Sequence, residues 1–416
     1  MAEIVVAIFI ATYLGMAAGQ VPGLKLDRSG IALIGAIALI AIDAMTPAQA
    51  VNFIDRPTIM LLFGLMIVAA QFGIAGVFEA FARRIAELAD RPYRLLATVI
   101  VVSGTLSAGL ANDIIVFAMT PLLCTGLRVR KVDPIPYLIA LAASANAGSA
   151  ATLIGNPQNI LIGQMTGLGF WRYAAIALPV SVMALVIVYG VIAWLWRAQF
   201  AVTVPVHDTT HDHKALPLDR RQYQKALLAT VVLLVLFATP VPREVSTLAV
   251  AGILLLSRRV HSRTLVSAVD WNLLIMFIGL FVVTGAFLAQ IQDGAGSGGI
   301  AARAAAQGLL PDRLSILVPM ALAVSNTIGN VPAVMLILQA WPSPPQGAMT
   351  ALAILSTLAG NLLLVGSIAN IIVAERAQAA GVRLGFIEHA RAGVPITLLS
   401  TAAAVGWLWA LKLIPF

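Results

Sequence analysis

The sequence predicts an all-α polytopic membrane protein with about ten transmembrane spans, two re-entrant hairpins and two inverted-topology repeats with broken helices. Hydrophobic residues make up 60% of the 416 positions and charged residues only 11%, and the mean hydropathy is +0.95. A soluble domain has about 25% charged residues. Apolar runs of membrane-spanning length recur from end to end, and similar motifs recur in the two halves. A large soluble helical protein is excluded, because its polar helix faces are missing.

Eight segments are predicted to cross the membrane as ordinary helices. They are 3–20, 29–45, 57–76, 172–197, 223–240, 244–257, 272–291 and 393–413. The first segment has neither a basic region before it nor a small-residue cleavage site after it. We therefore expect it to be a retained span and not a signal peptide.

Four further apolar segments are interrupted by polar residues near their middles. We expect 94–126 and 313–341 to be hairpins that enter and leave on one side, and 136–165 and 347–378 to be broken helices that cross. Non-helical backbone at membrane depth is tolerated only where protein or a watery cavity surrounds it. These breaks are therefore candidates for a functional site.

Matching motifs indicate an internal repeat. "DRPTIMLLFGLM" (55–66) resembles "DWNLLIMFIGLF" (270–281), and "LIGNPQNILI" (153–162) resembles "LVGSIANIIV" (364–373). Each half has five predicted crossings, so the second half is expected to be inverted relative to the first. Such repeats with paired broken helices point to a secondary transporter with its site at the midplane. The predicted parts are a first repeat at 1–197, a cytoplasmic linker at 198–222 and a second repeat at 223–416.

The distribution of basic residues predicts the orientation. With these crossings, 20 of the 26 Lys and Arg residues fall on one side of the membrane and six on the other. Basic loops face the cytoplasm, so both termini are expected outside a bacterial inner (plasma) membrane. The net charge of +8 is dispersed over short loops, which does not favour a nucleic-acid partner. The single cysteine, Cys124, excludes an internal disulfide and a cysteine-cluster metal site.

The first broken helix carries the strongest site signal. Pro157 cannot donate a backbone hydrogen bond and Gly155 permits a turn, so we expect Gly155-Asn156-Pro157 to separate two half-helices. Freed carbonyl groups attract cations or protons, and freed N–H groups attract anions. The expected site residues of the first half are Asn112, Asp113, Asn146, Ser149, Thr152, Gly155, Asn156, Gln158 and Asn159. Those of the second half are Ser325, Asn326, Thr327, Asn330, Ser356, Thr357, Asn361, Gly366, Ser367 and Asn370. The alternative is that these polar residues only hold helices together.

Asp113 is the only formally charged residue that the prediction places near the midplane of a hairpin or broken helix. An aspartate at that depth costs about 2.5–3.5 kcal/mol on insertion scales. We therefore predict that Asp113 binds the coupling proton or cation. The alternative is a structural cap for the second helix of the hairpin. No arginine or lysine is expected in the site.

Three other segments are not expected to bind a ligand or to catalyse a reaction. "GAGSGG" (294–299) matches a dinucleotide fingerprint by letters alone, since no strand precedes it. "HDTTHDH" (207–213) is expected to be a solvated linker and not a metal site, and the amphipathic segment 76–90 to lie along the membrane surface. No catalytic triad, phosphate-binding loop or paired catalytic carboxylates occur. An enzyme is therefore not expected, and no cofactor is needed besides a coupling ion, H⁺ or Na⁺.

The motifs resemble those of the ion transporter superfamily, which includes arsenite permeases, divalent anion/sodium symporters and certain sodium/proton antiporters. "ASANAGSAATLIGNPQN" (143–159) is similar to the broken-helix motif of the symporters, and Ser325-Asn326-Thr327 matches their hairpin signature. Ala111-Asn112-Asp113 looks instead like the Ala-Asn-Asp of arsenite permeases. "GNVPAV" (329–334) resembles the Asn-x-Pro turn of the permeases and antiporters.

The resemblance implies a homodimer in the lipid bilayer whose hairpins and broken helices move as an elevator against a scaffold. It also implies that their polar groups bind substrate and coupling cation. The leading expectation is proton-coupled efflux of a small inorganic oxyanion or its neutral acid, such as arsenite or antimonite. Two alternatives stay open. One is sodium-coupled uptake of a dicarboxylate, sulfate or similar anion, and the other is sodium/proton antiport.

Overall fold

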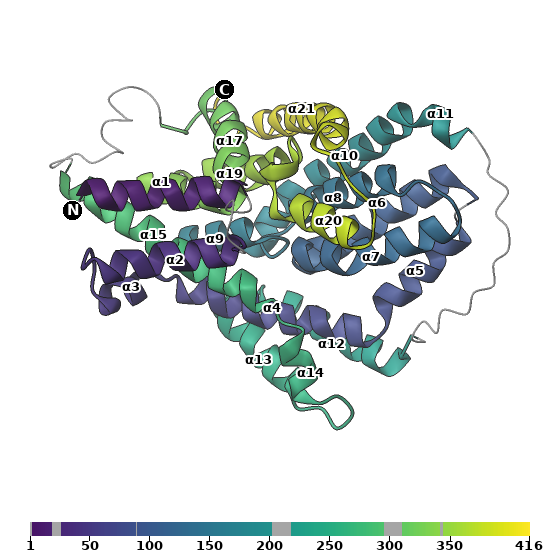
Figure 1. Cartoon of the computed structure of the whole chain (residues 1–416), viewed down its shortest axis with the longest axis horizontal. Helices are drawn as coiled ribbons and strands as arrows, with labels where there is room; N and C mark the ends of the chain where they lie inside the picture. Colours follow the sequence, from purple (N-terminus) through teal and green to yellow (C-terminus); the bar gives the residue numbers. More distant parts are fainter. Residues whose placement is uncertain (1, 19–25, 89, 202–217, 295–309, 342–343) are drawn as a thin grey trace.

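The structure is a computed structural model that describes residues 2–18, 26–88, 90–201, 218–294, 310–341 and 344–416 (Figure 1). The described residues form helices and connecting turns, with no strand among them. Five described helices are long and apolar enough to cross a membrane, and further apolar helices are shorter. The predicted all-α polytopic fold is confirmed. The histidine-rich motif at 207–213 and nearly all of "GAGSGG" lie outside the described residues.

The helices recur in the same order in the two halves. The first half contains α1 (Ala2–Ala18), α2 (Arg28–Ala41), α3 (Pro47–Phe53), α4 (Arg56–Ile74), α5 (Val77–Glu87), α6 (Pro92–Gly109), α7 (Asn112–Val129), α8 (Ile135–Ser149), α9 (Pro157–Thr166), α10 (Phe170–Leu195) and α11 (Arg197–Phe200). The second contains α12 (Arg220–Leu236), α13 (Arg243–Leu255), α14 (Ser262–Ser267), α15 (Trp271–Gly294), α17 (Leu314–Ile328), α18 (Asn330–Ala340), α19 (Gln346–Ala359), the 3₁₀ turn η1 (Leu364–Gly366), α20 (Ile368–Ala379) and α21 (Phe386–Ala410). The orientation of the halves across a bilayer stays a prediction.

Matching acidic residues begin matching helices. Asp55 caps α4 by accepting a hydrogen bond from the Thr58 N–H (2.8 Å), and Asp270 accepts one from the Leu273 N–H (3.0 Å) at the start of α15. Each cap satisfies an N–H that has no partner inside its helix. The aspartates noticed in the sequence repeat therefore have the same structural role.

The last span and the two breaks differ most from the sequence prediction. The last span begins at Phe386 and not at 393, because the Glu388 carboxylate accepts the Gly385 N–H (2.9 Å) and caps a helix that includes the polar residues at its start. The first half-helices end at Ser149 and Ala359, so the breaks cover 150–156 and 360–367 and are wider than Gly155-Asn156-Pro157. The short helices α3 and α14 were not expected.

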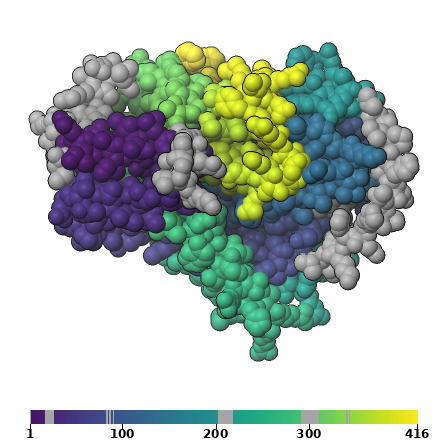
Figure 2. Space-filling view, in the orientation of Figure 1, coloured from purple at the N-terminus to yellow at the C-terminus, as the bar shows by residue number. Residues whose placement is uncertain are grey.

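The helices are packed in two groups (Figure 1). One group contains α1, α2 and α15, with α4 packed on α13. The other contains α6, α8, α10 and α21, and α20 packs against α7 and α8. Figure 2 shows α13 and α14 projecting from the main body. Large apolar side chains on the outer faces, such as Val186, Leu228 and Leu256, are 66%, 63% and 85% exposed, as expected for contact with lipid.

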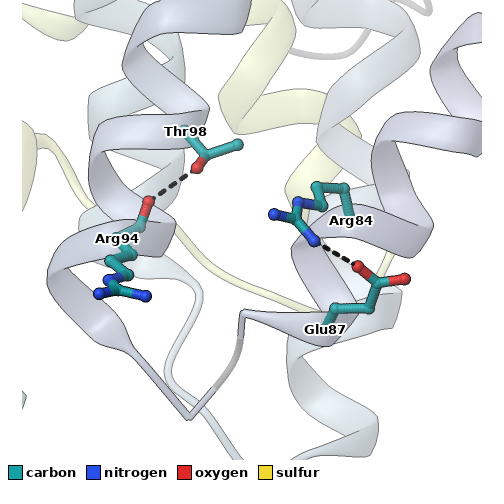
Figure 3. A network of polar contacts seen from close by, with 4 residues as sticks. All are labelled: Arg84, Glu87, Arg94 and Thr98. Atoms are coloured by element: carbon teal, nitrogen blue, oxygen red, sulfur yellow. Dashed lines mark hydrogen bonds and ion pairs between the residues drawn. The ribbon is translucent and has the colours of Figure 1, made fainter.

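Helices α5 and α6 carry the basic residues Arg84 and Arg94 near the turn that joins them (Figure 3). Arg84 pairs with Glu87 at 2.7 Å, and the Thr98 hydroxyl donates to the Arg94 carbonyl (2.8 Å). Phe78 on the other face of α5 is buried. An exposed ion pair of this kind contributes about 0–1 kcal/mol. The observed helix agrees with the amphipathic segment expected at 76–90.

Candidate functional site

Four helices of the hairpins and broken segments begin around one pocket. Its wall includes the first residues of α7, α9, α18 and α20, namely Asn112, Asp113, Pro157, Gln158, Asn330, Val331 and Ile368, together with Ser367, the cap of α20. The first turn of a helix has N–H groups without helical partners, and the helix dipole adds about half a positive charge there. Four such ends around one pocket make it attractive to an anion.

Other lining residues come from helices outside the breaks, namely Met16 of α1, Arg28 of α2, and Met276 and Leu280 of α15. The tip of the second hairpin adds Thr327, Ile328, Gly329 and Pro332, and the second break adds Val365. The open volume is about 40 Å³. One water needs about 10–15 Å³ by this measure, so the pocket fits only a small ligand or a few waters.

Asp113 is buried in this wall without a hydrogen-bond partner. Its side chain is 5% exposed, and its carboxylate accepts no hydrogen bond from the described residues. The residue that caps α7 is Ala111, and no side-chain cap bond is present. The structure therefore does not support the alternative in which Asp113 caps the second helix of the hairpin. A buried carboxylate without donors calls for a proton or a cation.

Each hairpin tip is bound to the break of its own half. The Asn112 N–H donates to the Gly155 carbonyl at 2.9 Å. In the second half, the Asn326 side chain donates to the Ala359 carbonyl at 2.9 Å. The Asn330 amide, oriented with its nitrogen toward the break, donates to the Gly366 carbonyl at 2.9 Å. These bonds hold the tips and the breaks as one unit.

Asn146 of α8 connects this unit across the two halves. Its amide nitrogen donates to Oδ1 of Asn361 (2.8 Å) and to Oδ1 of Asn370 (3.1 Å). Its own Oδ1 accepts hydrogen bonds from Asn112 (3.0 Å) and from the Ser367 hydroxyl (3.1 Å). One buried side chain thus links the first hairpin tip to the second break.

A second cluster surrounds Thr357 of α19. The Asn156 amide donates to the Thr357 hydroxyl (3.1 Å) and to the Ser149 hydroxyl (2.9 Å). Gln158 also donates to Thr357 (3.3 Å), and Thr357 donates to Oδ1 of Asn159 (3.2 Å). The first break is therefore joined to the second half as well.

The predicted site residues divide into a pocket wall and a supporting layer. Asn112, Asp113, Gln158, Thr327, Asn330 and Ser367 line the pocket. The supporting layer behind them contains Asn146, Ser149, Thr152, Gly155, Asn156, Asn159, Ser325, Asn326, Ser356, Thr357, Asn361, Gly366 and Asn370. Most polar side chains in this layer bind one another or backbone carbonyls. The interpretation that such residues hold helices together therefore describes the supporting layer well.

Three residues at the site, Arg28, Tyr173 and His389, were not predicted from the sequence. The expectation that no arginine or lysine lies there is wrong, because Arg28 lines the pocket from the first turn of α2. Arg28 lies at a helix end, where its side chain was expected to face the loop. Its place in the pocket depends on the packing of α2 beside the breaks. Tyr173 and His389 contact the break asparagines from spans that look ordinary, at 3.1 Å from Asn159 and 3.4 Å from Asn370.

No group of three or more His, Cys, Asp or Glu side chains suited to a metal ion is found within the described residues. Cys124 is buried in α7. The chemistry that the site offers is thus hydrogen bonding by amides and hydroxyls, the positive ends of four helices, one guanidinium and one carboxylate.

Comparison with known proteins identifies the class of membrane protein to which the chain belongs. The CitMHS family model, described as "Citrate transporter", matches residues 5–343. An uncharacterized transporter of Mycobacterium tuberculosis is 30% identical, and the match covers 98% of each chain. The silicon efflux transporter LSI3 of Oryza sativa is 26% identical over 93% of each. The crystal structure of the Alcanivorax borkumensis YdaH transporter has the same fold, with a TM-score of 0.57, 15% identity and coverage of 100% of this chain and 99% of that one.

The family match covers well over half of the chain, and full-length relatives are transporters and not enzymes. The predicted membership of the ion transporter superfamily is confirmed. This chain belongs to the CitMHS family of multi-pass membrane transporters.

Proposed function

We propose that this transporter carries a small anionic oxyacid by secondary active transport. The observation that carries the proposal is the convergence of four helix N-termini on one pocket that also contains an unpartnered, buried carboxylate. The N-termini suit the anion, and the carboxylate of Asp113 suits the coupling H⁺ or Na⁺. A gradient supplies about 2.3 kcal/mol per charge per 100 mV, which is enough to drive accumulation or extrusion.

The unit formed by the hairpins and breaks is the part that we propose moves. Hydrogen bonds among Asn112, Asn146, Asn361 and Asn370 support its movement as a rigid body. The surrounding α1, α2, α4, α13 and α15 would be the fixed scaffold of an elevator. A homodimer in a bacterial inner membrane, with both termini outside, belongs to the same proposal.

Proton-coupled efflux of arsenite or antimonite is the second candidate. The Ala111-Asn112-Asp113 tip resembles that of arsenite permeases, and a relative in rice is a silicon efflux transporter. A pocket of about 40 Å³ suits a small hydroxide. Arg28 in the wall weakens this candidate, because a neutral acid gains little from a guanidinium.

The proposal is tested with the full-length protein in proteoliposomes. Uptake of citrate, succinate, sulfate, phosphate and arsenite is measured under an imposed pH or sodium gradient. We expect accumulation of at least one ionised anion that depends on the gradient. Transport of arsenite alone would replace the proposal with the second candidate, and no gradient-dependent flux of any of the five would contradict both.

Asp113→Asn tests the coupling role. We expect it to abolish gradient-driven accumulation, because an amide neither takes up a proton nor neutralises a cation. Asp43→Asn is the control, since Asp43 is exposed in a turn with φ of 55°, a conformation that asparagine also tolerates. Undiminished, gradient-coupled accumulation in Asp113→Asn would remove Asp113 from the mechanism.

A further inference from the structure

We infer that Arg28 is a specificity-determining residue whose guanidinium binds the ionised substrate from the α2 side of the pocket. The inference rests on the proposed anion transport and adds the group that selects a charged acid over a neutral one. It concerns a residue outside the hairpins and broken helices, on the side of the pocket that we assign to the scaffold.

Arg28 has no hydrogen-bond or ion-pair partner among the described residues. It is the first residue of α2 and lines the pocket together with Asp113. Its Nε is fully buried without an acceptor, and its guanidinium makes no hydrogen bond or ion pair with the described residues. A buried charged donor without an acceptor is costly, so an acceptor supplied by a ligand would stabilise it.

The acids near Arg28 do not fill that role. The Asp27 carboxylate accepts the Gly30 N–H (2.8 Å) and the Ser29 hydroxyl (2.8 Å), and these bonds, the first above all, keep the pKa of Asp27 below its ordinary value. Glu375 of α20 is exposed and influences Arg28 only through space. Asp113 shares the pocket but is not paired with the guanidinium.

The corresponding arginine of the second half, Arg243, has a structural role. Arg243 is the first residue of α13, as Arg28 is of α2. Its guanidinium donates to the Gly163 carbonyl (3.2 Å) and to the Leu168 carbonyl, both near the C-terminal end of α9. Arg243 is therefore held by the protein, whereas Arg28 faces the pocket without such bonds.

The chemistry of the guanidinium defines the ligand class. It offers planar, paired N–H donors that match the two oxygens of a carboxylate or another oxyanion. Together with the four helix N-termini it would favour an acid that is ionised at neutral pH. A neutral hydroxide such as arsenous acid would gain much less from it.

Arg28→Gln and Arg28→Lys in the full-length protein test the inference. The probes are citrate, sulfate and arsenite, with binding to purified protein measured by calorimetry and KM measured in proteoliposomes. We expect Arg28→Gln to raise Kd and KM for the ionised probe by about tenfold or more, as for loss of a charge-assisted hydrogen bond. Arg28→Lys keeps the charge but loses the paired donors, so its effect should be smaller. Neither should change the values for arsenite.

Glu375→Gln is the matched control. It removes the exposed acid that acts on Arg28, and Glu375 does not line the pocket. An unchanged Kd and KM for the ionised probe in Arg28→Gln, or equal changes for arsenite, would overturn the inference while leaving anion transport intact. An equal rise in Kd and KM for the ionised probe in Glu375→Gln would show instead that Arg28 acts as part of a surface ion pair with Glu375. Absence of anion binding by the unaltered protein would overturn the inference and contradict the proposed function as well.

Discussion

The two breaks of this transporter are built by the same hydrogen bonds from different halves of the chain. In the first, the Asn159 amide donates to the Thr152 carbonyl at 3.0 Å. In the second, the Asn370 amide donates to the Gly360 and Leu363 carbonyls at 2.7 and 3.1 Å. In each break one asparagine binds carbonyl groups that the end of the first half-helix leaves free.

The breaks differ in the ring that supports the asparagine. The Tyr173 hydroxyl lies 3.1 Å from the Asn159 nitrogen and donates to the Ala150 carbonyl at 2.8 Å. In the second break, Nε2 of His389 lies 3.4 Å from the Asn370 nitrogen and 3.3 Å from the Asn361 carbonyl. Nδ1 of His389 is buried and has no hydrogen-bond partner among the residues that the structure describes. The second break therefore has the longer and less complete contacts.

Cross-links between the halves keep the two breaks in one unit in spite of this difference. Oδ1 of Asn159 accepts from Thr357 at 3.2 Å, and Oδ1 of Asn370 accepts from Asn146 at 3.1 Å. Each break is thus attached to the first half-helix of the other break. The two breaks therefore share the carbonyl-binding asparagine and these bonds to the other half, and they differ in the rings, the glycine contacts and the groups in the pocket.

The largest expected effect separates the glycines of the two breaks. A Cβ at Gly155 would lie 2.2 Å from the Ser149 carbonyl oxygen, which belongs to the backbone and cannot move freely. A Cβ at Gly366 would lie 2.2 Å from Oδ1 of Asn326, which is the end of a side chain. We expect Gly155→Ala to lower the free energy of unfolding by about 3 kcal/mol and Gly366→Ala by about 1 kcal/mol. Thermal unfolding in detergent measures both.

Gly190→Ala is the control for this comparison, because a Cβ at Gly190 in α10 would contact nothing within 4 Å. It should raise stability by about 0.5–1 kcal/mol, since alanine restricts the unfolded chain more than glycine does. Equal losses for Gly155→Ala and Gly366→Ala would show that the two breaks are packed alike.

The breaks themselves were predictable because they violate the pattern around them. Glycine, asparagine and proline at 155–157 interrupt an apolar run, and a related motif without the proline, "GSIAN", recurs at 366–370. A proline in a helix frees a backbone carbonyl, and at membrane depth such freed groups have to be satisfied within the protein. Short polar side chains contact only groups close to them in the chain or in space. Most predicted site residues therefore lie at the breaks or the hairpin tips.

Arg28, Tyr173 and His389 were not predictable in this way. Arg28 begins a helix, where an arginine normally faces water, and its place in the pocket depends on how α2 packs against elements far away in the sequence. Tyr173 and His389 lie near the ends of spans, where amphipathic rings are common. Tyr173 and His389 are recognised as counterparts only from their contacts with Asn159 and Asn370, which the sequence does not show.

A smaller effect is expected from the asparagines that bind the freed carbonyls. Asn159→Ala and Asn370→Ala each leave buried carbonyl groups without a donor, which should cost about 2 kcal/mol of unfolding free energy. The shared framework predicts losses for the two variants that agree within about 1 kcal/mol. Asn52→Ala in α3 is the control, since Asn52 is exposed and should tolerate alanine with little change. A large loss in only one of the two breaks would contradict the equivalence.

The smallest expected effect concerns the rings, and it tests the difference between the breaks directly. Tyr173→Phe removes one hydroxyl that contacts both Ala150 and Asn159, so we expect a loss of about 1 kcal/mol in unfolding free energy. His389→Tyr places a hydroxyl-bearing ring at the corresponding position of the second break. Because the contacts of His389 are long, this change should cost less than Tyr173→Phe.

Tyr93→Phe is the matched control, because Tyr93 is 42% exposed and its hydroxyl has no hydrogen-bond partner within the described part of the chain. Transport should be retained in His389→Tyr if the ring only supports Asn370 and the Asn361 carbonyl. A stable His389→Tyr protein that has lost gradient-driven accumulation would show that the imidazole does more than support the break. The imidazole, which has no counterpart in the first break, would then be part of the transport cycle.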